Sequence, residues 1–327
     1  MIADIPRRAF LRAAAAATAL AGLPHAARAL DYPTRPVRWI IGFPPGGGAD
    51  IVARIVGAWL SERLGQQVII ENRPGAGTNI ATEYVVRSAP DGYTLLWAGV
   101  SNAINASIFS DLSFDFLRDI APVAGVVAYP LVLEINPKVP AKTIAELIAL
   151  AKASPGKLTL ASYGTGTISQ VAGELFKLRA GIEMVHVPYK GGAPMLTDLL
   201  SGHVDAAINV VASDLPHIRS GAVRALATLG PKRLDALPDV PTLAETFAGY
   251  EALAFTGVGV ARGTPPEIIA RLNREINAGL ADPGLRKRLD DLTVVPLVFT
   301  PAEFGAYSAS ETEKWAKVIK AANIKAR

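Results

Sequence analysis

The chain has 327 residues, half of them hydrophobic, and a formal net charge of +4 at pH 7. At about 150 residues per domain, this length predicts two domains with a large core. The chain contains no cysteine, which excludes disulfide bonds, thiolate metal sites, iron–sulfur clusters and cysteine-based catalysis.

The first 29 residues have the order of a secretory signal peptide. A basic segment with the pair Arg7-Arg8 precedes a short apolar run at 13–23, and residues 27–29 fit the small-x-small cleavage rule. The run is far shorter than the about 20 apolar residues that span a bilayer. We therefore expect cleavage after Ala29 and export by either the Sec or the twin-arginine route, without a lipoprotein anchor. Cleavage removes four of the 33 Lys and Arg residues and one of the 29 Asp and Glu residues, and the remaining net charge of about +1 argues against a nucleic-acid partner.

After this segment, β-prone and helix-like stretches alternate. In chain order, the first unit consists of a strand at 37–41, a Pro/Gly loop at 43–48, a helix from Asp50 to about Gly65, a strand at 68–71, a turn at 74–77, a helix at 79–87 and a strand at 93–98. Strands that alternate with helices at this spacing predict parallel β-α-β units.

The same alternation restarts at residue 131. The second unit consists of a strand at 131–135, a helix at 144–153 with a capping box, a strand at 158–161, a glycine loop at 164–167, a helix at 169–180, a strand end at 186–189, a helix at 194–201, a strand at 206–210, a short helix at 215–220 and a strand at 225–229. A β-prone segment at 254–260 then returns to the first unit, and helices at 266–281, 285–290 and 301–322 complete the chain.

This order predicts an α/β fold of two parallel-type domains that are joined by two crossovers and separated by a cleft. Domain 1 is discontinuous and comprises residues 30–130 and 254–327. Domain 2, residues 131–253, is inserted into it. We expect the crossovers to form a hinge near residues 129–133 and 251–256.

Two glycine-rich loops carry the strongest functional signal. Residues 43–50 (FPPGGGAD) and 162–167 (SYGTGT) both end a strand and open a helix. Ligands of open α/β sheets sit at the carboxyl ends of strands, and the first N–H groups of a helix have no intrahelical partner and lie at the positive end of its dipole. The paired loops therefore predict binding of an anion such as a carboxylate. As the alternative, each glycine turn merely connects a strand to a helix.

Nucleotide motifs do not explain these loops. Neither loop has the Gly-Lys-Ser/Thr ending of a P-loop, and none of the glycine segments fits GxGxxG. Asp50 is well placed to cap the helix it opens. Since its charge would repel a carboxylate, the sequence favours a structural role for it over ligand contact.

The sequence shows no catalytic or metal-binding constellation. His186, His203 and His217 are scattered without an i, i+4 pair, no GxSxG elbow occurs, and no nucleophile–base pair is evident. We therefore predict no metal, no cofactor and no enzymatic activity. Phe43 and Tyr189 stand at strand ends beside glycine or proline, and we expect them to face a ligand, with a core position as the alternative. The four tryptophans lie in apolar runs or on a helix face and are expected in the core.

Several segments resemble the Bug family, also called TctC-like proteins, the substrate-binding proteins of tripartite tricarboxylate transporters. The matching segments are FPPGGGADIVAR (43–54), VIIENRPGAGTNIA (68–81), SAPDGYTLLWA (88–98), KLTLASYGTGTISQVAGELF (157–176), VPYKGGAPMLTDLLSGHVDAAI (187–208), LPDVPTLAE (237–245) and EKWAKVIKAANIK (313–325). They occur in order over almost the whole chain after the signal.

The resemblance implies a periplasmic two-domain binding protein of the type II periplasmic-binding fold. Such a protein acts as a monomer, closes on a small organic carboxylate and delivers it to inner-membrane permease subunits. In the family, main-chain amides and water from the two glycine loops hold the ligand carboxylate. The residues that match these loops are Pro45, Gly46, Gly47, Ala49, Asp50, Ser162, Gly164, Gly166 and Thr167. The residues that match positions near the cleft are Ser101, Asn102, Tyr189 and Lys190, with Asn209 as a specificity contact.

Two departures from the family pattern bear on the ligand. Ala49 stands where many members have Ser or Thr, and residues 206–211 differ from the usual sequence around that strand. The resemblance therefore predicts the residues that anchor the carboxylate better than those at the far end of the ligand pocket. A sensory component without a dedicated transporter and an exported hydrolase remain the alternatives at this point.

Overall fold

The computed structural model describes residues 31–109 and 111–325, and the predicted signal peptide lies outside these residues. The strands are β1 Val37–Ile41, β2 Val68–Asn72, β3 Thr94–Gly99, β4 Ile120–Ile135, β5 Thr159–Ser162, β6 Val185–Pro188, β7 Ala206–Val210, β8 Arg224–Thr228, β9 Leu253–Ala261 and β10 Val295–Pro296. The helices are α2 Gly48–Leu64, α3 Asn79–Val86 after a 3-10 turn at Ala76–Thr78, α4 Val100–Ile108, α5 Phe116–Asp119, α6 Ile144–Ala153, α7 Ile168–Ala180, α8 Gly192–Ser201, α9 Val211–Arg219, α10 Leu243–Thr246, α11 Pro266–Ala281, α12 Pro283–Asp290 and α13 Pro301–Ala321.

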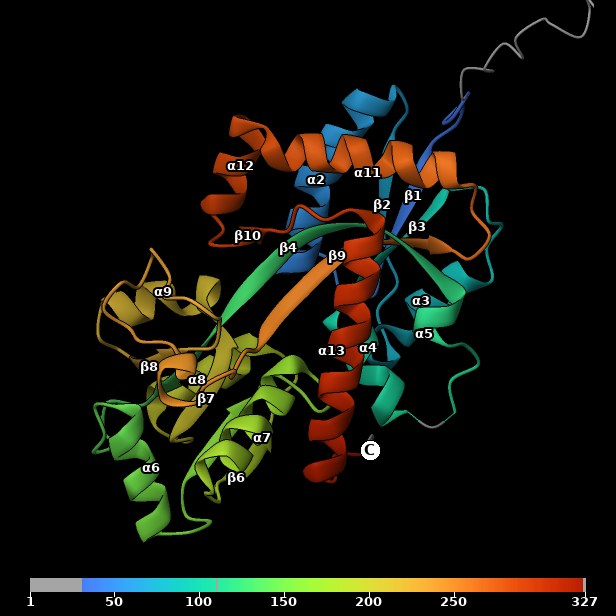
Figure 1. Ribbon diagram of the computed structural model, residues 1–327. Coiled ribbons are helices and arrows are strands. Elements are labelled where there is room, and N and C mark those ends of the chain that lie inside the picture. The colour runs from blue at the N-terminus through green and yellow to red at the C-terminus, as the bar shows by residue number, and fades with distance from the viewer. Residues whose placement is uncertain (1–30, 110, 326–327) are drawn as a thin grey trace, which may run out of the picture.

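The strands follow one continuous path in the order β2-β1-β3-β9-β4-β7-β5-β6, with β8 and β10 paired to β4 beside it (Figure 1). β1 runs parallel to β2 and β3, and β5 runs parallel to β6 and β7. The predicted β-α-β units therefore form two parallel groups, one at each end of the path. Buried parallel strands need apolar residues on both faces, and β1 (VRWII) meets this requirement, since four of its five residues are buried.

The strand β4 joins the two groups and is longer than the sequence analysis predicted. It spans 16 residues, Ile120–Ile135, whereas the prediction placed a strand only at 131–135. Its first part pairs antiparallel with β9 up to Pro130, and its last part pairs with β7 from Leu131 onward. Two register shifts against β9, near Pro122 and Gly125, absorb the strand-breaking residues. The sequence analysis assigned no element to the first part of this strand.

Helices cover both faces of the sheet. On one face, α2, α11 and α12 pack on β1, β3 and β4 around a cluster that includes Val56, Leu60 and Leu272. On the other face, α13 packs on α4 and β4, and Figure 1 shows its C-terminal turns beside α7. Trp39, Trp97 and Trp315 are buried as predicted. Of the helices that the structure describes, none combines the length and apolar character that crossing a membrane requires.

Candidate functional site

The predicted site residues gather at the carboxyl ends of the parallel strands. In the first group, these ends are the segments that follow β1, β2 and β3. In the second group, they are the segments that follow β5, β6 and β7. In α/β sheets this edge is the ligand-binding edge. The structure therefore offers two sets of three loops, and the two glycine loops follow the central strand of each set.

The first glycine loop is held from below by Asp50. Gly46 adopts a left-handed conformation (φ 82°) that favours glycine, and its N–H donates to Asp50 Oδ2 at 2.9 Å. Arg54 and Asn72 also donate to this buried carboxylate. Arg54, followed by the Gly46 amide and Asn72, lowers the pKa of Asp50 to about 2 against the opposing effect of burial.

Asp50 is therefore engaged by the protein itself, as the structural alternative predicted. The neighbouring loop residues remain open to solvent. Pro45 and Gly47 are exposed, and Phe43 and Ala49 are partly exposed. Gly47 precedes the first residue of α2, so the N–H groups at Gly48 and Ala49 belong to the unpaired first turn of the helix.

The second glycine loop has the same construction with a neutral anchor. Gly166 is left-handed (φ 75°), and its N–H donates to Gln170 Oε1 at 2.7 Å. Thr167 precedes the first residue of α7 as Gly47 precedes that of α2. In both loops, a left-handed glycine is thus tied to the side chain four residues later. The sequence contains this repeated spacing, but it was not recognised from the sequence.

A serine–histidine pair that the sequence analysis did not predict lies under the second loop. Ser162 Oγ is 2.7 Å from His186 Nε2, and Gln170 Nε2 is 3.3 Å from His186 Nδ1. Because Gln170 Oε1 accepts from Gly166, its Nε2 donor faces the ring, and Nδ1 must accept. The imidazole then carries its proton on Nε2 and donates to Ser162, while the hydroxyl donates to Gly164 O at 3.2 Å. In this arrangement, His186 Nε2 has no lone pair with which to act as a base toward Ser162.

The segment after β2 contributes residues that the sequence analysis missed. Four consecutive residues from Gly75 to Thr78 have positive φ, including Ala76 (45°) and Thr78 (84°), which L-residues rarely adopt. Thr78 Oγ1 and Asn79 Nδ2 are buried and lack a hydrogen-bond partner within the described part of the chain. Asn105 Nδ2 donates to Asn79 Oδ1 at 2.9 Å, which leaves the Asn79 donor free. An orphan donor at the start of α3 is suited to an anionic ligand or an ordered water.

The other predicted residues differ in whether their side chains already form hydrogen bonds within the protein. Asn102 is buried between the Gly99 amide and Thr82 Oγ1, and it holds the start of α4. Ser101 beside it is partly exposed, and Lys190 is exposed. The Tyr189 hydroxyl donates to Asp198 at 2.6 Å, and burial, with Asp198 as a further cause, raises the pKa of Tyr189 to about 12.

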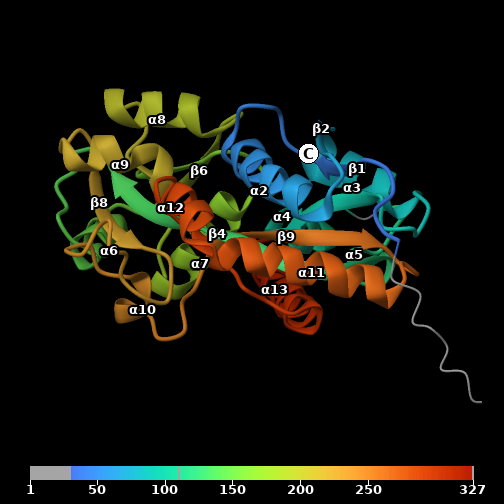
Figure 2. The ribbon, with the colours of Figure 1, turned by 90° about the horizontal axis from the view of Figure 1, so that it is seen from above.

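Contacts near the β4 crossover connect the two sets of loops. Phe43 and Ala49 of the first set pack in one apolar cluster with Tyr129 of β4 and Val210 at the end of β7. In the second set, a Cβ added to Gly166 would lie 3.3 Å from Ile108 Cδ1 of α4. Figure 2 shows the segment that leads into α2 on the same side of the molecule as α8.

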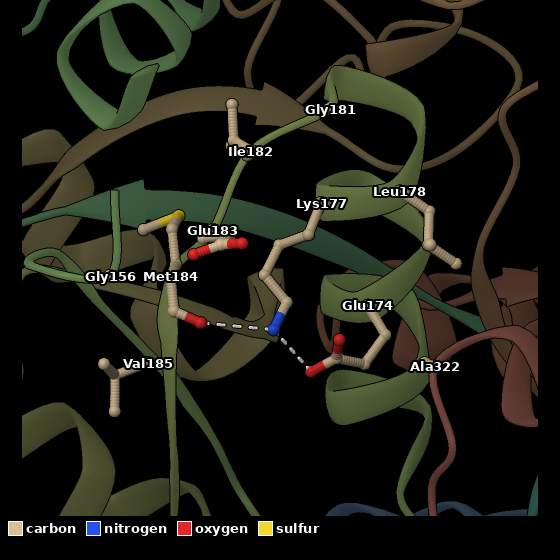
Figure 3. Close-up of a pocket in the computed structure, with 10 residues that line it drawn as sticks. All are labelled: Gly156, Glu174, Lys177, Leu178, Gly181, Ile182, Glu183, Met184, Val185 and Ala322. Atoms are coloured by element: carbon tan, nitrogen blue, oxygen red, sulfur yellow. Dashed lines mark hydrogen bonds and ion pairs between the residues drawn. The ribbon is translucent and has the colours of Figure 1, made fainter. Parts of the chain in front are cut away.

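The hollow in Figure 3 lies elsewhere. It measures ≈ 620 Å³, and residues of α7, the segment 181–185, Gly156 and Ala322 line it. Lys177 spans it to Met184 O and Glu174. None of the predicted site residues lines it, so we do not assign the ligand to it. The described residues contain no group of three or more His, Cys, Asp or Glu that could hold a metal ion.

Comparisons with known proteins agree with this arrangement. A family model described as "Tripartite tricarboxylate transporter family receptor" matches residues 52–324. Protein BugT of Bordetella pertussis is 38% identical over 310 residues, which cover 94% of this chain and 95% of BugT. The structure of R. palustris Rpa4515 with adipate is 34% identical with a TM-score of 0.81, covering 90% of this chain and 99% of that chain. MatC from Rhodopseudomonas palustris with bound malate is 30% identical with a TM-score of 0.76, covering 88% of this chain and 100% of that chain. These neighbours confirm the predicted α/β fold class.

Proposed function

Because the chain belongs to the tripartite tricarboxylate transporter receptor family, we propose that it is a periplasmic solute-binding protein that captures a small organic carboxylate between two domains. The observation that carries this proposal is the matched pair of glycine loops. Each loop is fixed from below by a side chain, Asp50 or Gln170, that occupies one amide. The remaining N–H groups at the helix starts are left for an anion.

We propose that the ligand carboxylate lies between the two glycine loops and the start of α3. Gly47, Gly48 and Ala49 offer main-chain donors from the first group, and Gly164 and Thr167 frame the second loop. Asn79 Nδ2 adds an unpartnered side-chain donor. The adipate and malate complexes of the related proteins support an organic acid as the ligand class.

For the domain division we propose residues 30–130 with 254–327, and residues 131–253. The strand pairing supports this division, since β4 exchanges β9 for β7 between Pro130 and Leu131, and β9 begins at Leu253 opposite Pro130. A rigid-body closure about these two strands would bring the loop sets together on the ligand.

We propose that the protein acts as a monomer, without a metal or cofactor, and hands its ligand to inner-membrane permease subunits. A catalytic role is disfavoured because His186 donates to Ser162 instead of accepting from it. A sensory component that binds the same ligand is the alternative, and genes for permease subunits beside this gene would favour transport.

The test is ligand binding by the purified protein. Thermal shift and calorimetry would compare hydroxy-, amino- and dicarboxylic acids with their uncharged amides, which keep the shape but lose the charge. Binding at a hundredfold excess over Kd stabilises the fold by about 2.7 kcal/mol, a shift of roughly 4 °C for a chain of this size. Binding of the amides as tightly as the acids, or binding of neutral solutes alone, would sink the proposal.

A further inference from the structure

Two buried acids lie beside the candidate site. Glu134 of β4 and Asp214 in the first turn of α9 both have 0% exposure. Neither oxygen of Glu134 has a hydrogen-bond donor within the described part of the chain, and the same holds for Asp214 Oδ1. The two carboxyl groups face each other, and burial and then Asp214 raise the pKa of Glu134 well above its ordinary value.

Among the residues that the structure describes, no cation compensates this pair. In the antiparallel register, Glu134 lies between Ala207 and Ala225, on the strand face that α9 covers with Val211 and Leu215. Two residues further along β4, on the same face, Asn209 and Thr228 flank Val132, and both are uncharged. The nearby guanidinium of Arg224 donates to Ala141 O and not to the acids.

Two facing carboxylates without a cation cannot both be ionised in an apolar enclosure, so the pair retains one proton. Asp214 is the better placed acceptor of the two, because Asn209 Nδ2 donates to its Oδ2 at 2.7 Å and because it lies in the first turn of α9. Glu134 then holds the proton and donates it toward Asp214 Oδ1.

The hydrogen bond to Asp214 fixes the direction of the Asn209 amide. Nδ2 donates to Asp214 Oδ2, so Oδ1 must face away. Oδ1 lies over the first residue of α8, where a Cβ added to Gly192 would be 3.1 Å from it. The hydrogen bond of the Asn209 side chain to Asp214 uses Nδ2 and leaves Oδ1 for another donor, although Asn209 as a whole is only 2% exposed. Asn209 is at the carboxyl end of β7, level with the second glycine loop at the end of the parallel strand β5.

We propose that Glu134 and Asp214 share one proton and act as positioning residues that present the Asn209 carbonyl oxygen to the ligand. The end of the ligand opposite the gripped carboxylate then carries a hydrogen-bond donor, a hydroxyl or an ammonium group, and not a second carboxylate. This inference rests on the proposed function, since it names the chemistry at the far end of the same site.

Calorimetry at pH 7 with four acids tests the ligand preference. The acids share one carboxylate and differ at the opposite end of the carbon chain: 4-hydroxybutanoate, 4-aminobutanoate, succinate and butanoate. The wild type is expected to bind the hydroxyl- or ammonium-bearing acid at least about tenfold more tightly than succinate, about 1.4 kcal/mol. Glu134→Gln keeps a neutral donor toward Asp214 and should retain this ratio within about twofold. Asp214→Leu removes the acceptor for Asn209 and should bring the ratio close to one in a protein whose circular dichroism is unchanged.

A measurement without ligand tests the pair directly and does not depend on the affinities of the variants. Carbon-13 NMR of the carboxyl carbons should show one neutral acid at pH 7, assigned to Glu134 through its loss in Glu134→Gln. Two ionised carboxyl signals, or succinate bound as tightly as the donor-bearing acids, would overturn the inference and leave the proposed function standing. Failure of every acid to bind, while neutral solutes bind, would overturn both.

Discussion

The anchor of the first glycine loop yields a prediction whose size follows from the structure. Asp50→Asn keeps an acceptor for the Gly46 amide but removes the charge that pairs with Arg54. Lowering a carboxyl pKa from 3.8 to about 2 on folding contributes up to about 2.5 kcal/mol at neutral pH. Solvent reaches Arg54, whose side chain is 53% exposed, and screens part of this energy. We therefore expect the variant to lose about 1–2 kcal/mol, or about 1.5–3 °C in Tm.

The pH dependence supplies the decisive comparison. The folded-state pKa of Asp50 is depressed, so its contribution is present above the ordinary pKa of 3.8 and is lost as pH falls toward about 2. Urea unfolding followed by tryptophan fluorescence should show a constant gap between wild type and Asp50→Asn from about pH 5 to 7, closing between about pH 4 and 2. Glu313→Gln removes an i, i+4 pair whose partners are both more than 70% exposed, and it should cost at most about 0.5 kcal/mol. Equal stability of Asp50→Asn and wild type at pH 7, or a gap that persists in acid, would refute this account of the loop.

Four further substitutions test binding, folding and catalysis separately. Gly166→Ala forces a left-handed alanine against Ile108, which costs about 1–2 kcal/mol, and it should also weaken carboxylate binding in calorimetry. Gly181→Ala is the control, because Gly181 is also left-handed but lies at an uncrowded helix end. It should cost similar stability and leave the affinity for the carboxylate unchanged. Equal affinities of Gly166→Ala and Gly181→Ala would contradict a binding role for the second loop. Asn79→Ala removes a donor that has no partner among the described residues and should weaken binding about tenfold; unchanged affinity would remove Asn79 from the site. Ser162→Ala should be as inactive as wild type on ester substrates, and hydrolysis by the wild type that this change abolishes would restore the hydrolase alternative.

Local patterns were sufficient to predict most of the fold. The alternation of apolar strands and helices placed the parallel groups, and the prediction for α11, Pro266–Ala281, matches the structure. Helices that begin in glycine-rich sequence were placed too late, since α2 begins at Gly48 and α8 at Gly192. The first part of β4 was missed because its proline and glycine residues are accommodated by register shifts against β9. Such shifts depend on the partner strand, which a local pattern does not contain.

The site was predictable in its loops but not in its side-chain partners. The loop positions follow from where a strand ends and a helix begins, which residue types indicate. The left-handed conformation of Ala76 and Thr78 has no signal in their residue types. The contact between Ser162 and His186 and that between Glu134 and Asp214 join residues far apart in sequence. These pairings arise from tertiary packing alone. The ligand-binding role of the predicted residues remains a prediction that the substitutions above test.

The two loop anchors also explain why one carboxylate is the natural ligand charge for this site. Asp50 is ionised, but Arg54 neutralises it beneath the loop, and the anchor of the second loop, Gln170, is neutral. The free amides therefore act through partial charges, about half a unit per helix start, and not through a lysine or arginine. Two helix starts together balance roughly one negative charge. Under the proposed pairing, a second carboxylate at the far end would meet the acceptor oxygen of Asn209, whereas a hydroxyl or ammonium group could donate a hydrogen bond to it.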